Sequence, residues 1–169
     1  VQITKSGLAG REERDVASMD IPNAFIQTIL PRKPDEERVI MKIRGKLVDW
    51  LLEIDPTEYA SLVVIERGAK VLYLHILRAI YGMLEASLLW YRKFRKDLET
   101  IGFEFNVYDA CVANRQVNNK QHTVRFHVDD ILSSHVDPKV NTRFGEWANK
   151  MYGKLKPVEI HRGLSLIHI

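Results

Sequence analysis

The sequence contains almost no cysteine and no long apolar run. Its 169 residues include one cysteine, Cys111, which excludes an internal disulfide and a cysteine-rich zinc site. The longest apolar runs are only a few residues long, such as VLYL at 71–74, and they predict no membrane-spanning helix. The first twenty residues are polar and charged, which is not typical of a secretory signal. We therefore expect an intracellular protein in a reducing compartment, with no membrane partner.

The sequence also has little excess charge of either sign. It contains 25 Lys and Arg against 22 Asp and Glu, a net charge of +3, which only weakly favours a polyanionic partner. Hydrophobic residues make up 46% and charged residues 28%, a composition typical of a globular domain and not of a disordered or fibrous chain. The length allows a sizeable core but makes a second full domain unexpected.

Hydrophobic periodicity and turn residues predict alternating strands and helices. A first strand is expected to end near Asp20, because Pro22 lacks a backbone donor. The later elements, in chain order, are a strand at 39–43, a helix at 49–62, a strand at 71–77, a helix at 78–101, a hairpin of 111–117 with 123–128, a strand at 131–134, a helix from Asp137 to Gly153, and a strand at 158–160.

The main elements follow the order strand, helix, two strands in a hairpin, helix, strand. This order predicts an α+β fold of the ferredoxin-like, split β-α-β type, with an antiparallel sheet and helices on one face. In that layout the Asp129-Asp130 turn lies beside the end of the first strand, where Asp20 lies.

Three aspartates therefore form the candidate catalytic site. Asp20 and Asp129 are 109 residues apart, so only the fold can bring them together. Nucleotidyl transfer uses two metal ions held by carboxylates, and Mg²⁺ prefers such hard oxygen ligands. An Asp-Asp pair such as Asp129-Asp130 is also common in ordinary turns without a metal, and Asp20 alone is more often a cap or an ion-pair partner.

Four motifs in order resemble those of copia-type retrotransposon reverse transcriptases. The motifs appear at family-like spacing. They are an Asp followed by an Ala-aromatic pair, a Tyr-Gly block that leads to Trp-Tyr, a Gly-Phe with a Cys-Val segment, and a Val-Asp-Asp. They are DIPNAFIQ at 20–27, AIYGM at 79–83 with WY at 90–91, GF at 102–103 with DACV at 109–112, and FHVDDIL at 126–132. The resemblance covers residues 19 to about 163 and implies RNA-directed DNA polymerase activity.

The resemblance implies that Asp20, Asp129 and Asp130 are catalytic and hold two Mg²⁺ ions, with Mn²⁺ as the alternative ion. The backbone carbonyl of Ile21 would complete one metal site.

For the substrates, the resemblance implies nucleotide-binding roles for Ile21, Phe25, Tyr81 and Gly82. Phe25 would be the steric gate against a 2′-hydroxyl, while Tyr81 and Gly82 would line the incoming nucleotide and the templating base. Val128 would lie next to the primer end.

The implied partners are an RNA or DNA template with its primer, deoxynucleoside triphosphates, and the rest of a retroelement polyprotein, including integrase and RNase H. The implied location is a cytoplasmic retroelement particle or the nucleus. The expected organisation is a poorly ordered fingers remnant at 1–18, a palm at 19–163 with a partial fingers insertion at about 31–70, and a non-native tail at 164–169.

The sequence also departs from the family pattern. The usual Lys-Gln-Ser-Pro after the Tyr-Gly block is here LEAS at 84–87, which replaces a lysine by a leucine and adds an acidic residue. Two alternative functions follow: an inactive retroelement remnant that only binds nucleic acid, and, less favoured, a metal-dependent phosphohydrolase using the same aspartates.

Several other residues have plain structural interpretations. His122, His127 and His135 do not follow a zinc-site spacing and are expected to face different sides of the sheet as structural or exposed residues. The tryptophans Trp50, Trp90 and Trp147 are expected in the core, as is Cys111. The basic residues of the long helix are expected on a solvated face or against phosphates; they are Arg92, Lys93, Arg95 and Lys96.

Overall fold

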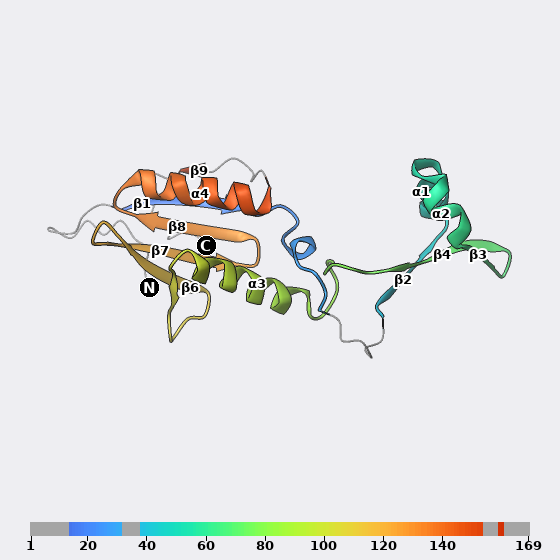
Figure 1. Cartoon of the computed structure of the whole chain (residues 1–169), viewed down its shortest axis with the longest axis horizontal. Helices are drawn as coiled ribbons and strands as arrows, with labels where there is room; N and C mark the ends of the chain where they lie inside the picture. The colour runs from blue at the N-terminus through green and yellow to red at the C-terminus, as the bar shows by residue number, and fades with distance from the viewer. Residues whose placement is uncertain (1–13, 32–37, 154–158, 161–169) are drawn as a thin grey trace, which may run out of the picture. The chain divides into compact units, whose positions relative to one another are not determined.

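A computed structural model describes residues 14–31, 38–153 and 159–160. The chain divides into two compact units, each with its own sheet (Figure 1). Unit 2 is the segment Ile29–Ala79, and unit 1 is formed by the chain before and after that segment. All residues predicted to form the site belong to unit 1.

Unit 1 is built on a six-stranded antiparallel sheet with strand order β5-β6-β7-β8-β1-β9. Asn118 and Asn119 join β6 to β7, and both adopt the positive φ that a tight two-residue hairpin needs. The strands are β1 (Asp15–Asp20), β5 (Glu104–Phe105), β6 (Val112–Val117), β7 (Lys120–His127), β8 (Asp130–His135) and β9 (Glu159–Ile160).

Two helices, α3 (Ala86–Thr100) and α4 (Pro138–Tyr152), pack on one face of this sheet. Phe94 of α3 lies against Phe126 of β7, with ring centroids 4.8 Å apart, and Phe144 of α4 lies 5.6 Å from His122 of the same strand. Positions 122 and 126 share a face because side chains alternate along a strand. In Figure 1, α4 runs alongside β1 and β8, in agreement with its contacts to both strands.

The helix α4 has the boundaries that its sequence predicts. The Asp137 carboxylate accepts the Lys139 N–H at 3.0 Å and Pro138 occupies the first turn. Gly153 follows the helix with φ of 88°.

The strand β1 begins earlier than expected. Ala17 and Met19 are buried and alternate with half-buried neighbours, so residues 15–18 belong to the sheet and not to a poorly ordered start. The rest of that expected start, and the expected tail at 164–169, lie outside the described residues.

Unit 2 is a three-stranded antiparallel sheet, in the order β2-β4-β3, with short helices. Its range of 29–79 is wider than the insertion expected at about 31–70. Its elements are β2 (Ile40–Arg44), α1 (Lys46–Ile54), α2 (Pro56–Tyr59), the 3₁₀ turn η2 (Ala60–Leu62), β3 (Val63–Glu66) and β4 (Ala69–His75).

The helix α1 buries Val48 but exposes Leu47, Trp50 and Ile54. The side chain of Trp50 is 55% exposed, so the expectation that it lies in the core is wrong. Helical periodicity identifies an apolar stripe, but it does not show whether the same chain covers that stripe. Cys111 is likewise only half-buried.

Two predicted helices have different limits in the structure. The helix expected at 49–62 is broken at Asp55, whose carboxylate accepts the Glu58 N–H at 3.0 Å and so begins α2. The helix expected at 78–101 begins only at Ala86, because Gly82 adopts φ of 92°, which an α-helix does not allow. The strands β3 and β5 were not predicted.

The chain is therefore an α+β protein with antiparallel sheets and four α-helices in its described part. None of the helices in that part has both the length and the apolar character needed to cross a bilayer.

Candidate active site at the ends of β1 and β8

The ends of β1 and β8 bring the predicted aspartates together. Asp20 is the last residue of β1 and pairs directly with Asp130, the first residue of β8. Directly paired residues in an antiparallel sheet point to the same face, with Cβ atoms roughly 4.5–5.5 Å apart. Beyond this pair, the Ile21 N–H donates to the Asp129 carbonyl at 3.0 Å. The proximity expected from the sequence is thus present in the backbone.

The turn that carries Asp129 has an unusual backbone. His127 pairs with Asp130, so Val128 and Asp129 form a two-residue loop. Val128 has φ of 55°, and such a conformation in a β-branched residue costs roughly 1–3 kcal/mol. The rest of the structure must hold this turn in place.

The carboxylates at the ends of β1 and β8 are ligands of the kind that a hard cation prefers. Asp20 and Asp129 are half-buried and Asp130 is exposed. Like charges directly opposite each other in a sheet are unfavourable, and a bound cation would offset that repulsion. Within the described residues, however, no three His, Cys, Asp or Glu side chains converge as a ready-made metal site. The structure therefore shows carboxylates of the type that Mg²⁺ prefers, with Asp20 and Asp130 paired in the sheet, but no preformed metal site in its described part.

Phe25 and Tyr81, both predicted to contact the nucleotide, contact each other. Their ring centroids are 4.5 Å apart and tilted by 50°. Phe25 is buried in the short 3₁₀ helix η1 (Ala24–Gln27), whereas Tyr81 is 56% exposed. Gly82 follows with φ of 92°, and nothing lies within 4 Å of where its Cβ would be. A glycine at this position therefore serves the backbone conformation and not a close approach.

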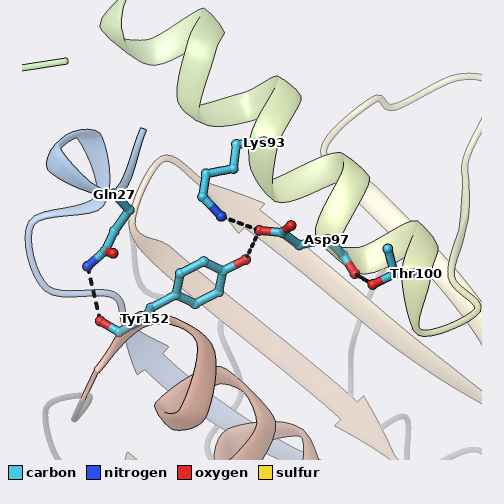
Figure 2. A network of polar contacts seen from close by, with 5 residues as sticks. All are labelled: Gln27, Lys93, Asp97, Thr100 and Tyr152. Atoms are coloured by element: carbon cyan, nitrogen blue, oxygen red, sulfur yellow. Dashed lines mark hydrogen bonds and ion pairs between the residues drawn. The ribbon is translucent and has the colours of Figure 1, made fainter. Parts of the chain in front are cut away.

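A polar network links η1 to both helices of unit 1 (Figure 2). The Gln27 side-chain amide donates to the Tyr152 carbonyl at 3.1 Å. The Tyr152 hydroxyl donates to Asp97 Oδ2 at 2.5 Å, and Lys93 Nζ pairs with the same oxygen at 2.6 Å. Burial, followed by the hydrogen bond to Asp97, raises the pKa of Tyr152 far above its usual value, so the hydroxyl remains a donor.

The basic residues of α3 are partly neutralised. Lys93 pairs with Asp97, and Arg95 pairs with Glu99 at 2.9 Å along the same helix. Arg92 and Lys96 are exposed on the helix surface. This arrangement favours a solvated helix face over a dedicated phosphate site at Lys93 and Arg95.

One contact at the site was not predicted. Trp90, expected only as a core residue, donates its indole N–H to the Val128 carbonyl at 2.6 Å. The sequence signal was the Trp90-Tyr91 pair of the second motif, but a motif does not show which carbonyl an indole reaches. The expectation that the three strand histidines face different sides is also wrong for His122 and His135, whose buried rings lie 5.8 Å apart.

The chain matches no protein-family model, and neither the curated proteins nor the solved structures contain a match to it.

Proposed function

We propose that this chain is the palm of a copia-type retrotransposon reverse transcriptase, and that it transfers deoxynucleotides to a primer 3′-hydroxyl on an RNA or DNA template. The proposal joins the four ordered sequence motifs to the geometry at the ends of β1 and β8.

One observation carries the proposal more than any other. Two motifs separated by more than a hundred residues contribute adjacent backbone positions, through the Asp20–Asp130 pair and the hydrogen bond from Ile21 to Asp129. If these aspartates served only as a turn and a cap, nothing would require them to meet at the ends of two paired strands.

The strand order supports the finer fold assignment in this proposal. Along the sheet, β7, β8, β1 and β9 are consecutive neighbours, with α3 between β1 and β7 in the chain and α4 between β8 and β9. This is the connectivity expected of a ferredoxin-like palm. Unit 2, inserted between η1 and Tyr81, would then correspond to part of the fingers.

The chemistry supplied by two bound Mg²⁺ ions is activation of the primer hydroxyl and neutralisation of the leaving pyrophosphate. The chain would contribute the carboxylates of Asp20, Asp129 and Asp130 and the carbonyl of Ile21 as ligands.

The Phe25–Tyr81 pair would form the wall beside the sugar of the incoming nucleotide. Gly82 would lie next to this wall, and Val128 would lie under the primer end. The expected partners are a primer–template duplex, deoxynucleoside triphosphates and the remainder of the polyprotein, in a cytoplasmic particle or in the nucleus.

Primer extension with Mg²⁺ and deoxynucleotides on an RNA template tests the proposal. Asp129→Asn should lower incorporation at least about a hundredfold, because catalysis here is mainly electrostatic. Asp137→Asn is the matched control: it makes the same change at the cap of α4, where Asn caps as well as Asp does. This control should retain activity.

The two alternatives predict different results. A chain that extends no primer but still retards a primer–template duplex equally with and without Asp129→Asn would be an inactive remnant. Phosphate release from a simple ester that depends on Asp20, without primer extension, would instead indicate a phosphohydrolase.

A further inference from the structure

The turn between β7 and β8 has a backbone that its own sequence does not favour. Of its two residues, only the first, Val128, has positive φ. That pattern is typical of a type II′ turn, in which glycine is the usual first residue. A valine here must be held by contacts from outside the turn.

Two contacts hold the turn, one on each of its carbonyls. The Trp90 indole N–H donates to the Val128 carbonyl across 38 residues of chain, at 2.6 Å. The Ile21 N–H donates to the Asp129 carbonyl at 3.0 Å. The first contact comes from α3 and the second from the end of β1.

The orientation of Trp90 is itself fixed by packing. The residue is 1% exposed, and its ring stacks on Phe94 and meets Tyr152 edge-on, with centroids 5.4 Å away in each case. A buried indole N–H without an acceptor is costly, so the Val128 carbonyl is the acceptor that satisfies it.

We propose that Trp90 is a positioning residue: its indole N–H holds the Val128–Asp129 turn in its left-handed backbone and thereby fixes the Asp129 carboxylate beside the end of β1. The effect on turn geometry stands on the contacts alone, while the effect on catalysis rests on the proposed function.

The competing interpretation is that Trp90 only fills the core. Trp90→Phe separates the two, because it keeps an aromatic ring and removes the N–H. Val128→Gly removes the need for the contact, because glycine adopts positive φ freely. Trp147→Phe makes the same chemical change on α4, where the ring stacks on Phe144.

Amide hydrogen exchange by NMR on the full chain gives a readout that does not depend on activity. In Trp90→Phe, the Ile21 amide should exchange about tenfold faster, as expected for loss of one buried hydrogen bond. The Phe126 amide, which donates to the Cys111 carbonyl at 3.0 Å, should be unchanged. Adding Val128→Gly should bring the Ile21 rate back to within about threefold of wild type, and Trp147→Phe should leave it unaltered.

Unchanged exchange at Ile21 in Trp90→Phe would overturn the proposal. So would equal acceleration at Ile21 and Phe126, which indicates general loosening of the core, or no recovery on adding Val128→Gly. If Trp90→Phe does not fold, a through-hydrogen-bond coupling between Trp90 Nε1 and the Val128 carbonyl carbon in wild type decides instead: its presence supports the contact and its absence overturns it.

Primer extension provides the second arm. Trp90→Phe should lower kcat about tenfold with little change in KM for the deoxynucleotide, because Trp90 is buried and is not among the residues proposed to contact the nucleotide. If the wild-type chain extends no primer while the exchange results hold, the proposed function fails and the positioning role of Trp90 stands.

Discussion

His122 lies fully buried between the sheet and α4, and its neighbours determine which of its nitrogens carries the hydrogen. Arg115 Nε donates to His122 Nδ1 at 3.1 Å, and because a guanidinium only donates, Nδ1 must be the acceptor. His122 Nε2 therefore carries the hydrogen and donates to Ser133 Oγ at 2.8 Å, and Ser133 donates to Asn141 Oδ1. His135 is the other nearby titratable ring.

This environment predicts a pH dependence of stability. Burial, followed by repulsion from Arg115, His135 and Arg14, lowers the pKa of His122 to about 3. Below pH 6.5 the unfolded chain binds a proton at His122 that the folded chain does not, so stability falls as the pH drops from about 6.5 toward 3. The loss from this group between pH 7 and 4.5 should be up to about 2.5 kcal/mol.

Urea unfolding at the two pH values measures this loss. His122→Gln should have a shallower pH dependence than wild type, whereas His127→Gln, at an exposed strand position, should have the wild-type dependence. Parallel curves for wild type and His122→Gln would contradict the prediction.

At the scale of elements, the junction of α3 and α4 depends on Tyr152. The Tyr152 hydroxyl donates to the Asp97 carboxylate, and Tyr152 itself is only 3% exposed. Tyr152→Phe should therefore lower the free energy of unfolding by about 1.5–3 kcal/mol, the range for a hydrogen bond to a charged group.

The matched control is Tyr91→Phe on α3. The Tyr91 hydroxyl donates to the Ala110 carbonyl at 3.2 Å and accepts from Arg95 Nη1 at 3.3 Å. Both contacts are long and the first is exposed to water, so this change should cost less than about 1 kcal/mol. Denaturant unfolding measures both costs. Equal losses of stability would show that the hydrogen bond to Asp97 contributes no more than the exposed contact of Tyr91.

The segment before α3 depends on the backbone of Gly82. Since nothing lies near a Cβ at this position, Gly82→Ala should cost about 1–2 kcal/mol through its positive φ alone. Gly82→Asn should cost less, because Asn tolerates left-handed backbone better than Ala. Thermal unfolding of both variants shows which substitution lowers stability more. A larger loss of stability for Gly82→Asn than for Gly82→Ala would indicate steric crowding of the longer side chain instead.

Elements with local signals were predictable from the sequence, and those decided by distant contacts were not. The Asn118-Asn119 turn and the Asp137-Pro138 cap determine the hairpin and α4 through neighbouring residues. The start of α3 was not predictable, because its apolar pattern continues across Gly82.

The candidate site also combines features that the sequence predicts with features that depend on distant contacts. The motif residues could be listed, and the proximity of Asp20 to Asp129 and Asp130 followed from the strand order, although the turn itself is Val128–Asp129 and Asp130 already belongs to β8. The link from Trp90 to Val128 could not be predicted, since it depends on how α3 packs against the turn.

At the scale of the whole molecule, the two units should unfold separately. Unit 2 has a small core that includes Val48, Val71 and Leu72, and it contains Trp50, whereas Trp90 reports on unit 1. Val48→Ala should lower the stability of unit 2 by about 2 kcal/mol and shift only its transition. Val140→Ala, equally buried in α4, should shift only the transition of unit 1.

Tryptophan fluorescence during denaturation distinguishes the transitions, with Trp50→Phe used to remove the signal of unit 2. A single transition that moves equally in both valine variants would mean that the chain unfolds as one cooperative body.

The two ends of unit 2 lie next to each other. The Leu30 N–H donates to the Leu77 carbonyl at 3.1 Å, and Ile29 forms a bridge with Arg78. A segment whose ends are neighbours can lengthen, shorten or be exchanged over evolutionary time without disturbing the chain on either side. The pairing of β1 with β8 has no such freedom, because a slip of one residue would turn Asp20 to the opposite face of the sheet. Related genes should therefore differ most in length between positions 29 and 79 and least across the two strands that meet at the aspartates.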